Sequence, residues 1–112
     1  MEFPFAAEDI SGIEICHTEG IKAAVPKGES TDYLYNLLKT ISLEKVDKVE
    51  VSGIAESGIR FRLSDGTEYE IVYISVGVKN WYLYDISGNQ MYFTRADIEG
   101  VCNSLIEEYG GH

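Results

Sequence analysis

One hairpin constrains the fold of this chain more than any other feature of its sequence. Residues 59–71, Ile-Arg-Phe-Arg-Leu-Ser-Asp-Gly-Thr-Glu-Tyr-Glu-Ile, alternate apolar and charged side chains on both sides of an Asp-Gly pair. This alternation is typical of strands with one buried face, and Asp-Gly between two such strands is a strong signal for a tight turn. The segment therefore predicts two antiparallel strands joined around Asp65 and Gly66.

The side chains also favour one register for this hairpin. A loop of residues 64–66, with its glycine in the left-handed region, pairs Phe61 with Tyr69 and Arg62 with Glu68. A two-residue loop would instead mix apolar and anionic side chains on one face. We therefore predict the three-residue loop, with a solvated ladder of cross-strand ion pairs on one face. Its remaining pairs are Leu63 with Thr67, Ile59 with Ile71 and Arg60 with Glu70.

The length and composition are those of one globular domain. The chain has 112 residues, of which 45% are hydrophobic and 25% charged, and we treat residues 1–112 as a single domain. No apolar run approaches the ~18–20 residues of a membrane span, so we expect no direct membrane insertion. Residues 1–9 contain neither the basic nor the apolar region of a signal peptide. Cys16 and Cys102 have no metal-ligand spacing and are expected to be reduced and unpaired.

The charge of the chain limits its partners. The 19 acidic and 9 basic residues give a formal net charge of −10. A field of that sign repels phosphate backbones and anionic lipids, which argues against nucleic acid and membrane headgroups. The acids are spread from Glu2 to Glu108 without a long block, as on a solvated surface. A basic partner protein or a cationic ligand is the alternative interpretation.

Two helical patterns stand among the extended segments. Leu34, Leu37, Leu38 and Ile41 share one face of a helix over residues 33–41, preceded by three candidate N-caps at Ser30-Thr-Asp32. The second helix follows Thr94-Arg-Ala-Asp97, which resembles a capping box. Its apolar stripe consists of Ile98, Val101, Cys102, Leu105, Ile106 and Tyr109.

The order of the elements predicts the fold class. The expected strands are residues 13–17, 21–25, 46–51, 59–63, 67–78, 80–85 and 90–93, which gives the order β-β-α-β-β-β-β-β-α. Parallel strands would need a crossover after nearly every strand. The chain is therefore predicted to be an α+β protein, with an antiparallel sheet and two helices packed on one face. Residues 72–78 are apolar on both faces, which favours a central strand.

No catalytic or cofactor motif accompanies these elements. Glu14, Cys16, His17 and Glu19 come nearest to a metal cluster, but Cys16 and His17 point to opposite faces of a strand and cannot share an ion. Ser57 lacks the strained elbow of a nucleophilic serine, and His17 is the only internal candidate base. No phosphate-binding glycine motif occurs. We therefore expect no enzymatic activity, no metal and no cofactor.

Aromatic residues are concentrated in the C-terminal strands. Trp81 and Leu83 point opposite to Tyr82 and Tyr84, so one of these two sets leaves the helix-covered face. Tyrosine is common in recognition surfaces because it offers a large contact area with a polar tip, although filling the core is the alternative role. We hypothesise a binding patch on the open side of the sheet. Its members are Val72, Ile74, Val76, Tyr82, Tyr84 and Tyr92.

Several stretches also resemble a known group of domains. They are Phe3-Pro-Phe5, Asp9-Ile-Ser-Gly-Ile-Glu-Ile15, Leu63-Ser-Asp-Gly-Thr-Glu-Tyr-Glu-Ile71 and Tyr92-Phe-Thr-Arg-Ala-Asp-Ile98. The chain resembles small uncharacterised extracytoplasmic domains of gut Firmicutes, found in lipoproteins or at the C-terminus of BlaR1-type membrane peptidases. The resemblance implies an exported accessory domain of the cell envelope with an unknown ligand, and it supplies no functional residues.

The leading hypothesis is a non-enzymatic binding or accessory module. Its open sheet face would contact a protein partner or a second copy of the chain in a homodimer. The alternative is a small-ligand carrier with a tyrosine-rich cavity between the sheet and the C-terminal helix. An enzyme is the third hypothesis, and it would require a cleft that gathers His17 with Glu14 or Ser57.

Overall fold

A computed structural model describes residues 1–17, 20–47, 57–75 and 80–110. Its elements alternate as the sequence predicts, with a short 3-10 helix added before the first strand. They are η1 (Ala7–Asp9), β1 (Ile10–His17), β2 (Gly20–Pro26), α1 (Glu29–Thr40), β3 (Glu44–Val46), β4 (Ser57–Leu63), β5 (Glu68–Ser75), β6 (Trp81–Asp85), β7 (Gln90–Thr94) and α2 (Ile98–Tyr109).

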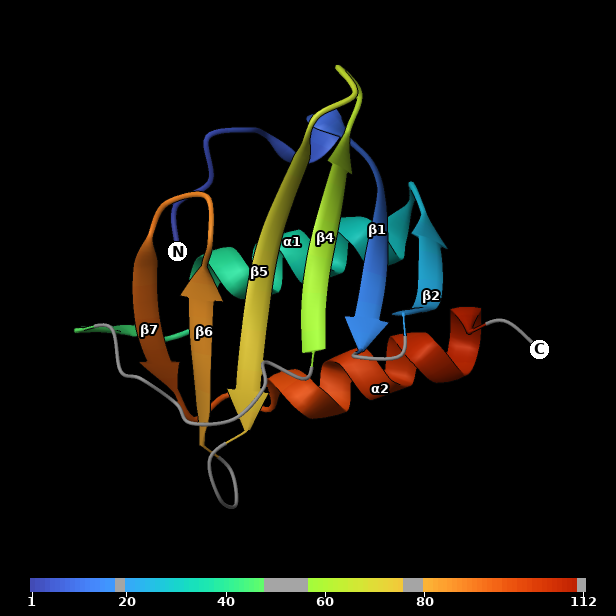
Figure 1. The fold of residues 1–112 in the computed structure, drawn as a ribbon. Coiled ribbons are helices and arrows are strands. Elements are labelled where there is room, and N and C mark those ends of the chain that lie inside the picture. The colour runs from blue at the N-terminus through green and yellow to red at the C-terminus, as the bar shows by residue number, and fades with distance from the viewer. Residues whose placement is uncertain (18–19, 48–56, 76–79, 111–112) are drawn as a thin grey trace.

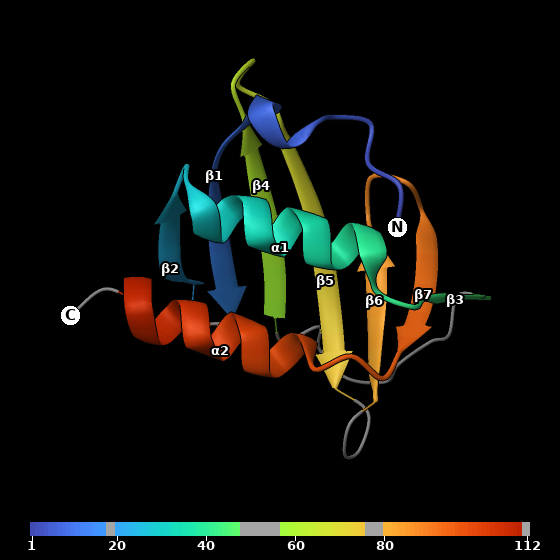
Figure 2. The same ribbon diagram turned by 180° about the vertical axis from the view of Figure 1, so that it is seen from behind.

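The strands form one seven-stranded sheet in the order β2-β1-β4-β5-β6-β7-β3. Every neighbouring pair is antiparallel. Both helices lie against the same face, behind the strands in Figure 1 and in front of them in Figure 2. The predicted α+β fold is confirmed, and β5 is the central strand as its apolar sequence suggested. Because β2 and β3 lie at opposite edges, α1 crosses the whole sheet between them.

The predicted register of the β4–β5 hairpin is confirmed. Phe61 lies opposite Tyr69, and Arg62 lies opposite Glu68. The amide of Leu63 donates to the carbonyl of Thr67 at 2.9 Å, which closes the three-residue loop. Gly66 has φ +90°, the left-handed conformation that the loop requires. Ile59, Phe61 and Ile71 are fully buried on the helix side.

The helices bury the predicted apolar stripes but begin at other residues than predicted. Helix α1 starts at Glu29, four residues before the expected 33. The Thr31 hydroxyl donates to the Gly28 carbonyl at 2.8 Å and accepts from the Gly28 amide at 3.0 Å. The side chain that stabilises the first turn therefore belongs to a residue within the helix and not to the N-cap. Helix α2 is capped by Asp97, whose carboxylate accepts from the Gly100 amide at 2.8 Å.

Thr94 is therefore not the helix cap that the sequence suggested. It belongs to β7, and its hydroxyl donates to the Ser42 carbonyl at 3.0 Å. The residue links β7 to the chain entering β3, and the helix starts only after Asp97 has turned the backbone. A threonine three residues before an aspartate satisfies the capping pattern whether or not the intervening residues are helical.

The third strand differs from its predicted range. Strand β3 is Glu44–Val46, and it pairs with β7 at the edge of the sheet. The chain reaches this edge directly from α1, so pairing begins two residues before the predicted start at 46. Residues 48–51 of the predicted strand, and residues 76–78 of the strand that contains β5, lie outside the described residues.

The N-terminal segment completes the core on the helix side, where Figure 2 shows it running above α1 between η1 and the end of the sheet that holds β6 and β7. Phe3 and Phe5 form a cluster of rings with Tyr35, Phe61 and Tyr69, at centroid distances of 5.0–5.7 Å. The Tyr35 hydroxyl donates to the carbonyl of Phe5 at 2.6 Å. This segment therefore covers Tyr69 on the helix side of the sheet.

Candidate functional site

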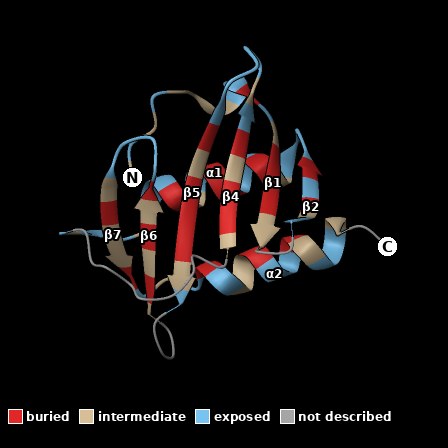
Figure 3. Cartoon of the chain, viewed as in Figure 1, coloured by how far each residue is buried: buried red, intermediate tan, exposed pale blue. Residues whose placement is uncertain are grey.

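Strand alternation places four of the predicted patch residues together on the face opposite the helices. Val72 lies opposite Tyr84, and Ile74 lies opposite Tyr82, on neighbouring strands β5 and β6. The other set of this strand, Trp81 and Leu83, is buried on the helix side. Figure 3 shows buried and half-buried residues alternating along β6. Val76, the remaining aliphatic member of the predicted patch, lies outside the described residues.

The prediction that Tyr92 joins this patch is wrong. Tyr92 lies opposite Leu83 in β6, so its side chain is on the helix-covered face, where it packs against the hydrophobic core. In the β6–β7 hairpin, Asp85 lies opposite Gln90, and residues 86–89 form the loop between them. That register turns odd-numbered residues of β7, instead of even-numbered ones, toward the open face.

Met91 and Phe93 take the place of Tyr92 on the open face. Met91 lies opposite Tyr84, and Phe93 lies opposite Tyr82. The rings of Tyr82 and Phe93 meet edge to face, with centroids 5.6 Å apart. The β6–β7 register alone, deduced from the four-residue loop that joins Asp85 to Gln90, would have identified both residues. We call the set the open-face patch: Val46, Val72, Ile74, Tyr82, Tyr84, Met91 and Phe93.

The open-face patch is only partly accessible to solvent. Val72 and Met91 are 9% and 4% exposed, and they form its floor. The side chains of Ile74, Tyr82, Tyr84 and Phe93 are half-buried, and Val46 is likewise half-buried at the β3 edge. The tyrosine hydroxyls add polar groups to this surface, and that of Tyr84 donates to the Asn89 side chain at 2.9 Å.

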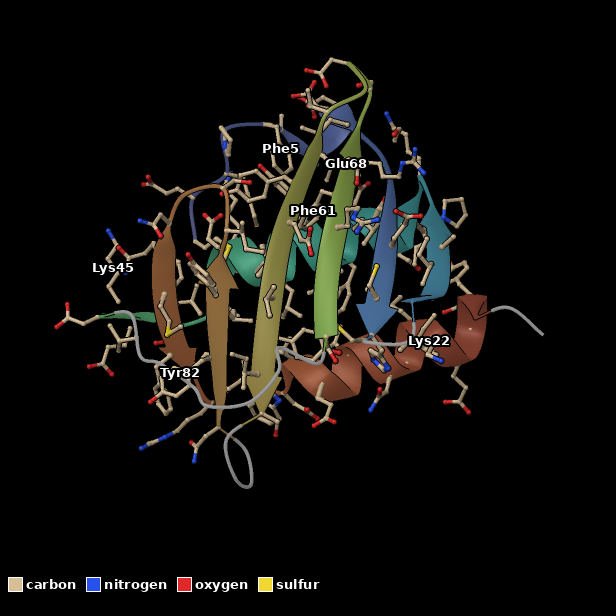
Figure 4. All side chains as sticks on the ribbon, viewed as in Figure 1. Phe5, Lys22, Lys45, Phe61, Glu68 and Tyr82 are labelled. Atoms are coloured by element: carbon tan, nitrogen blue, oxygen red, sulfur yellow. The ribbon has the colours of Figure 1, made fainter. Side chains whose placement is uncertain are left out.

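The other half of the same face carries charged side chains. Arginines and glutamates form ion pairs there, as the sequence suggests, but with other partners than predicted, because Glu14 of β1 joins them. Arg60 binds Glu14 at 3.3 Å and Glu68 at 3.0 Å, and Arg62 lies 3.7 Å from Glu14. The direct cross-strand contacts that the register suggested, Arg60 with Glu70 and Arg62 with Glu68, are not the ion pairs formed among the described residues. In Figure 4, Tyr82 and Glu68 mark the apolar and the charged region.

The residues weighed for catalysis are only partly brought together. His17 of β1 lies opposite Ser57 of β4, so these two residues are cross-strand neighbours. Within the described ranges, no hydrogen bond joins their side chains. No group of three or more His, Cys, Asp and Glu residues able to hold a metal ion occurs there either.

Both cysteines are free thiols. Burial is the main cause that raises the pKa of Cys16, with nearby carboxylates adding to it and Arg60 opposing it. Cys102 is fully buried under the sheet, and burial raises the pKa of its thiol to about 12. Neither thiol has the depressed pKa that marks a reactive cysteine.

Comparisons with protein-family models, curated proteins and solved structures find no match to this chain. In the part of the chain that the structure describes, neither helix has the length and apolar character needed to cross a membrane.

Proposed function

We infer that this protein is a non-enzymatic binding module that docks a partner protein on the open-face patch. The observation that carries this proposal is the division of the sheet. One face is buried under both helices, while the other presents Ile74, Tyr82, Tyr84 and Phe93 half-buried. Aromatic side chains at the centre of a surface are frequent anchors of protein interfaces.

The charge of the chain favours a basic partner over a second copy. Two copies would bring net charges of −10 against each other, whereas a basic protein would be attracted. Glu44 of β3 and Glu70 of β5 share the patch's face, and neither forms an ion pair with another described residue. We therefore propose a partner with an apolar centre and a basic rim, and homodimer formation becomes an outcome of the test.

No specific observation favours the carrier hypothesis. The layer between the sheet and α2 contains Tyr73, Cys102 and Leu105, each at most 6% exposed. These three side chains belong to the hydrophobic core, and the described geometry gives a carrier function no support. The envelope location that the resemblance implies stays a prediction.

Matched serine variants test the proposal. The folded protein and its Tyr82→Ser, Phe93→Ser and Tyr33→Ser variants are immobilised and exposed to extract of the cells that produce it. Tyr33 is the control because it is 57% exposed on α1, in the other layer of the fold. We expect a basic protein to be retained by the unmodified chain and by Tyr33→Ser, and about tenfold less by the two patch variants.

The folding of each variant is checked by its thermal transition before binding is compared. Added salt should weaken retention, since the attraction is partly electrostatic. Equal retention by all four proteins, or retention of the chain itself as the only partner, would contradict the proposal.

A further inference from the structure

A groove on the helix side of the sheet lies apart from the open-face patch. It has a volume of about 580 Å³ and lies between residues 2–4 of the N-terminal segment and the turn that joins β6 to β7. The side chains that matter for its chemistry are Glu2, Phe3, Tyr69, Asp85 and Tyr92. The size is within the usual range of about 300–1,000 Å³ for small-molecule sites.

Asp85 gives the groove a buried negative charge. Its residue is 4% exposed. One carboxylate oxygen accepts a hydrogen bond from the Tyr69 hydroxyl, and the other accepts from the Gly88 amide at 2.9 Å. These bonds satisfy the oxygens but bring no cation. Among the described residues no ion pair includes Asp85, and the ion pairs that Arg60 and Arg62 form with glutamates lie on the opposite face of the sheet.

The neighbouring tyrosines are affected by this charge. Burial first, and then the Asp85 carboxylate and Glu2, raise the pKa of Tyr92. The pKa of Tyr69 is raised by burial and by its hydrogen bond to Asp85. Burial is the largest cause of both shifts, and the carboxylates add to it because a negative potential makes a phenol harder to ionise. Glu2, an exposed residue at the rim, adds to that potential.

Aromatic rings line the same groove. Tyr92 is half-buried on β7, and Phe3 meets the edge of Tyr69 with ring centroids 5.7 Å apart. The faces of aromatic rings attract ammonium groups, and the attraction grows when the site is shielded from water. An uncompensated buried carboxylate beside aromatic walls is the combination that recognises an organic cation.

We propose that this groove binds a small organic cation through an alkylammonium group. The ammonium would lie beside Tyr92 and near Asp85, with Glu2 adding attraction from the rim. The site is independent of the open-face patch, because its side chains lie on the other face of the sheet. The two proposals can therefore fail separately.

A pair of isosteric probes tests the proposal by NMR titration. Choline carries the quaternary ammonium, and 3,3-dimethyl-1-butanol has the same shape without the charge. We expect saturable shifts of the Gly88 and Tyr92 amides with choline, and at least about tenfold weaker binding of the neutral alcohol. Equal affinity for both probes, or no saturable shift with choline, would overturn the proposal.

Charge-matched variants locate the binding. Glu2→Gln removes a rim charge and should weaken choline binding several-fold, whereas Glu108→Gln on α2 should leave it unchanged. Tyr92→Leu keeps an apolar side chain but removes the ring, so it should reduce the preference for choline over the alcohol several-fold, while Asp85 and Glu2 retain the remainder. Tyr82→Ser on the open face should change nothing. Equal weakening by Glu2→Gln and Glu108→Gln would show a diffuse electrostatic effect and overturn the site.

Discussion

Glu14 is the residue on which the charged half of the open face depends. It is 8% exposed, and its two carboxylate oxygens are shared between Arg60 and Arg62. Exposed ion pairs contribute little to the free energy of unfolding. A mostly buried carboxylate between two guanidinium groups is different, because removing its charge leaves both donors without their anionic acceptor and destabilises the protein. The side chains of Arg60 and Arg62 remain partly exposed to water, which limits the destabilisation.

Replacing Glu14 by glutamine should lower the free energy of unfolding by about 1–2 kcal/mol. The amide keeps the shape of the side chain but removes the charge that two arginines share. Glu70→Gln on the neighbouring strand is the matched control, with an expected loss below about 0.5 kcal/mol. Urea denaturation of the three proteins measures the difference. A larger loss for Glu70→Gln would contradict the role given to Glu14.

The two thiols should differ in reactivity. Cys102 is fully buried and its pKa is raised to about 12, so at pH 8 it holds almost no thiolate. Cys16 is half-buried, and its pKa is raised as well. We expect iodoacetamide to modify Cys16 slowly in the folded protein and to leave Cys102 intact, with both modified in urea. Peptide mass spectrometry reads the two sites, and alkylation of Cys102 first would contradict the described packing.

At the scale of elements, the register and turn of the β4–β5 hairpin could be predicted because its two strands alternate without interruption around one turn. The two-residue loop would have put glutamates against Phe61 and Leu63. The β6–β7 hairpin gave no such constraint. Tyrosines occur on both of its faces, and Ile86 lies in its loop at 45% exposed, so an apolar residue there does not mark a strand. This ambiguity is why the sequence predicts the wrong face for Tyr92.

The turn of the β4–β5 hairpin gives a direct test at this scale. Gly66 has φ +90° with open space around it, so substitution there strains the backbone without a clash. Gly66→Ala should destabilise the protein by about 1 kcal/mol, and Gly66→Asn by less, because asparagine tolerates the left-handed region. Denaturation curves measure both. Equal stability of the alanine variant and the unmodified chain would contradict this turn geometry.

At the scale of the molecule, the sequence predicts the sheet and the two helices that cover it, but not the N-terminal segment that packs beside the helices. Alternation and helical periodicity are local properties, and they were sufficient for the antiparallel sheet and its two helices. The packing of Phe3 and Phe5 against Tyr69 depends on residues more than sixty positions apart. No local pattern encodes it. The groove beside Asp85 was invisible for the same reason, since it exists only where the N-terminal segment meets the β6–β7 turn.

The proposed function requires that the open face of the sheet, and not the helix layer, contacts another protein. Two tyrosines can distinguish the two faces, because one lies in each layer of the fold. Tyr82 is half-buried in the open-face patch, and Tyr33 is exposed on α1. Both positions accept benzoylphenylalanine, a photoreactive residue close to tyrosine in shape.

Photo-crosslinking from these two positions in the producing cells is therefore the most direct measurement. We expect a covalent adduct between position 82 and a basic protein, and none to that protein from position 33. Adducts formed from position 33 alone, or an adduct from position 82 only to a second copy of the chain, would contradict the proposed function.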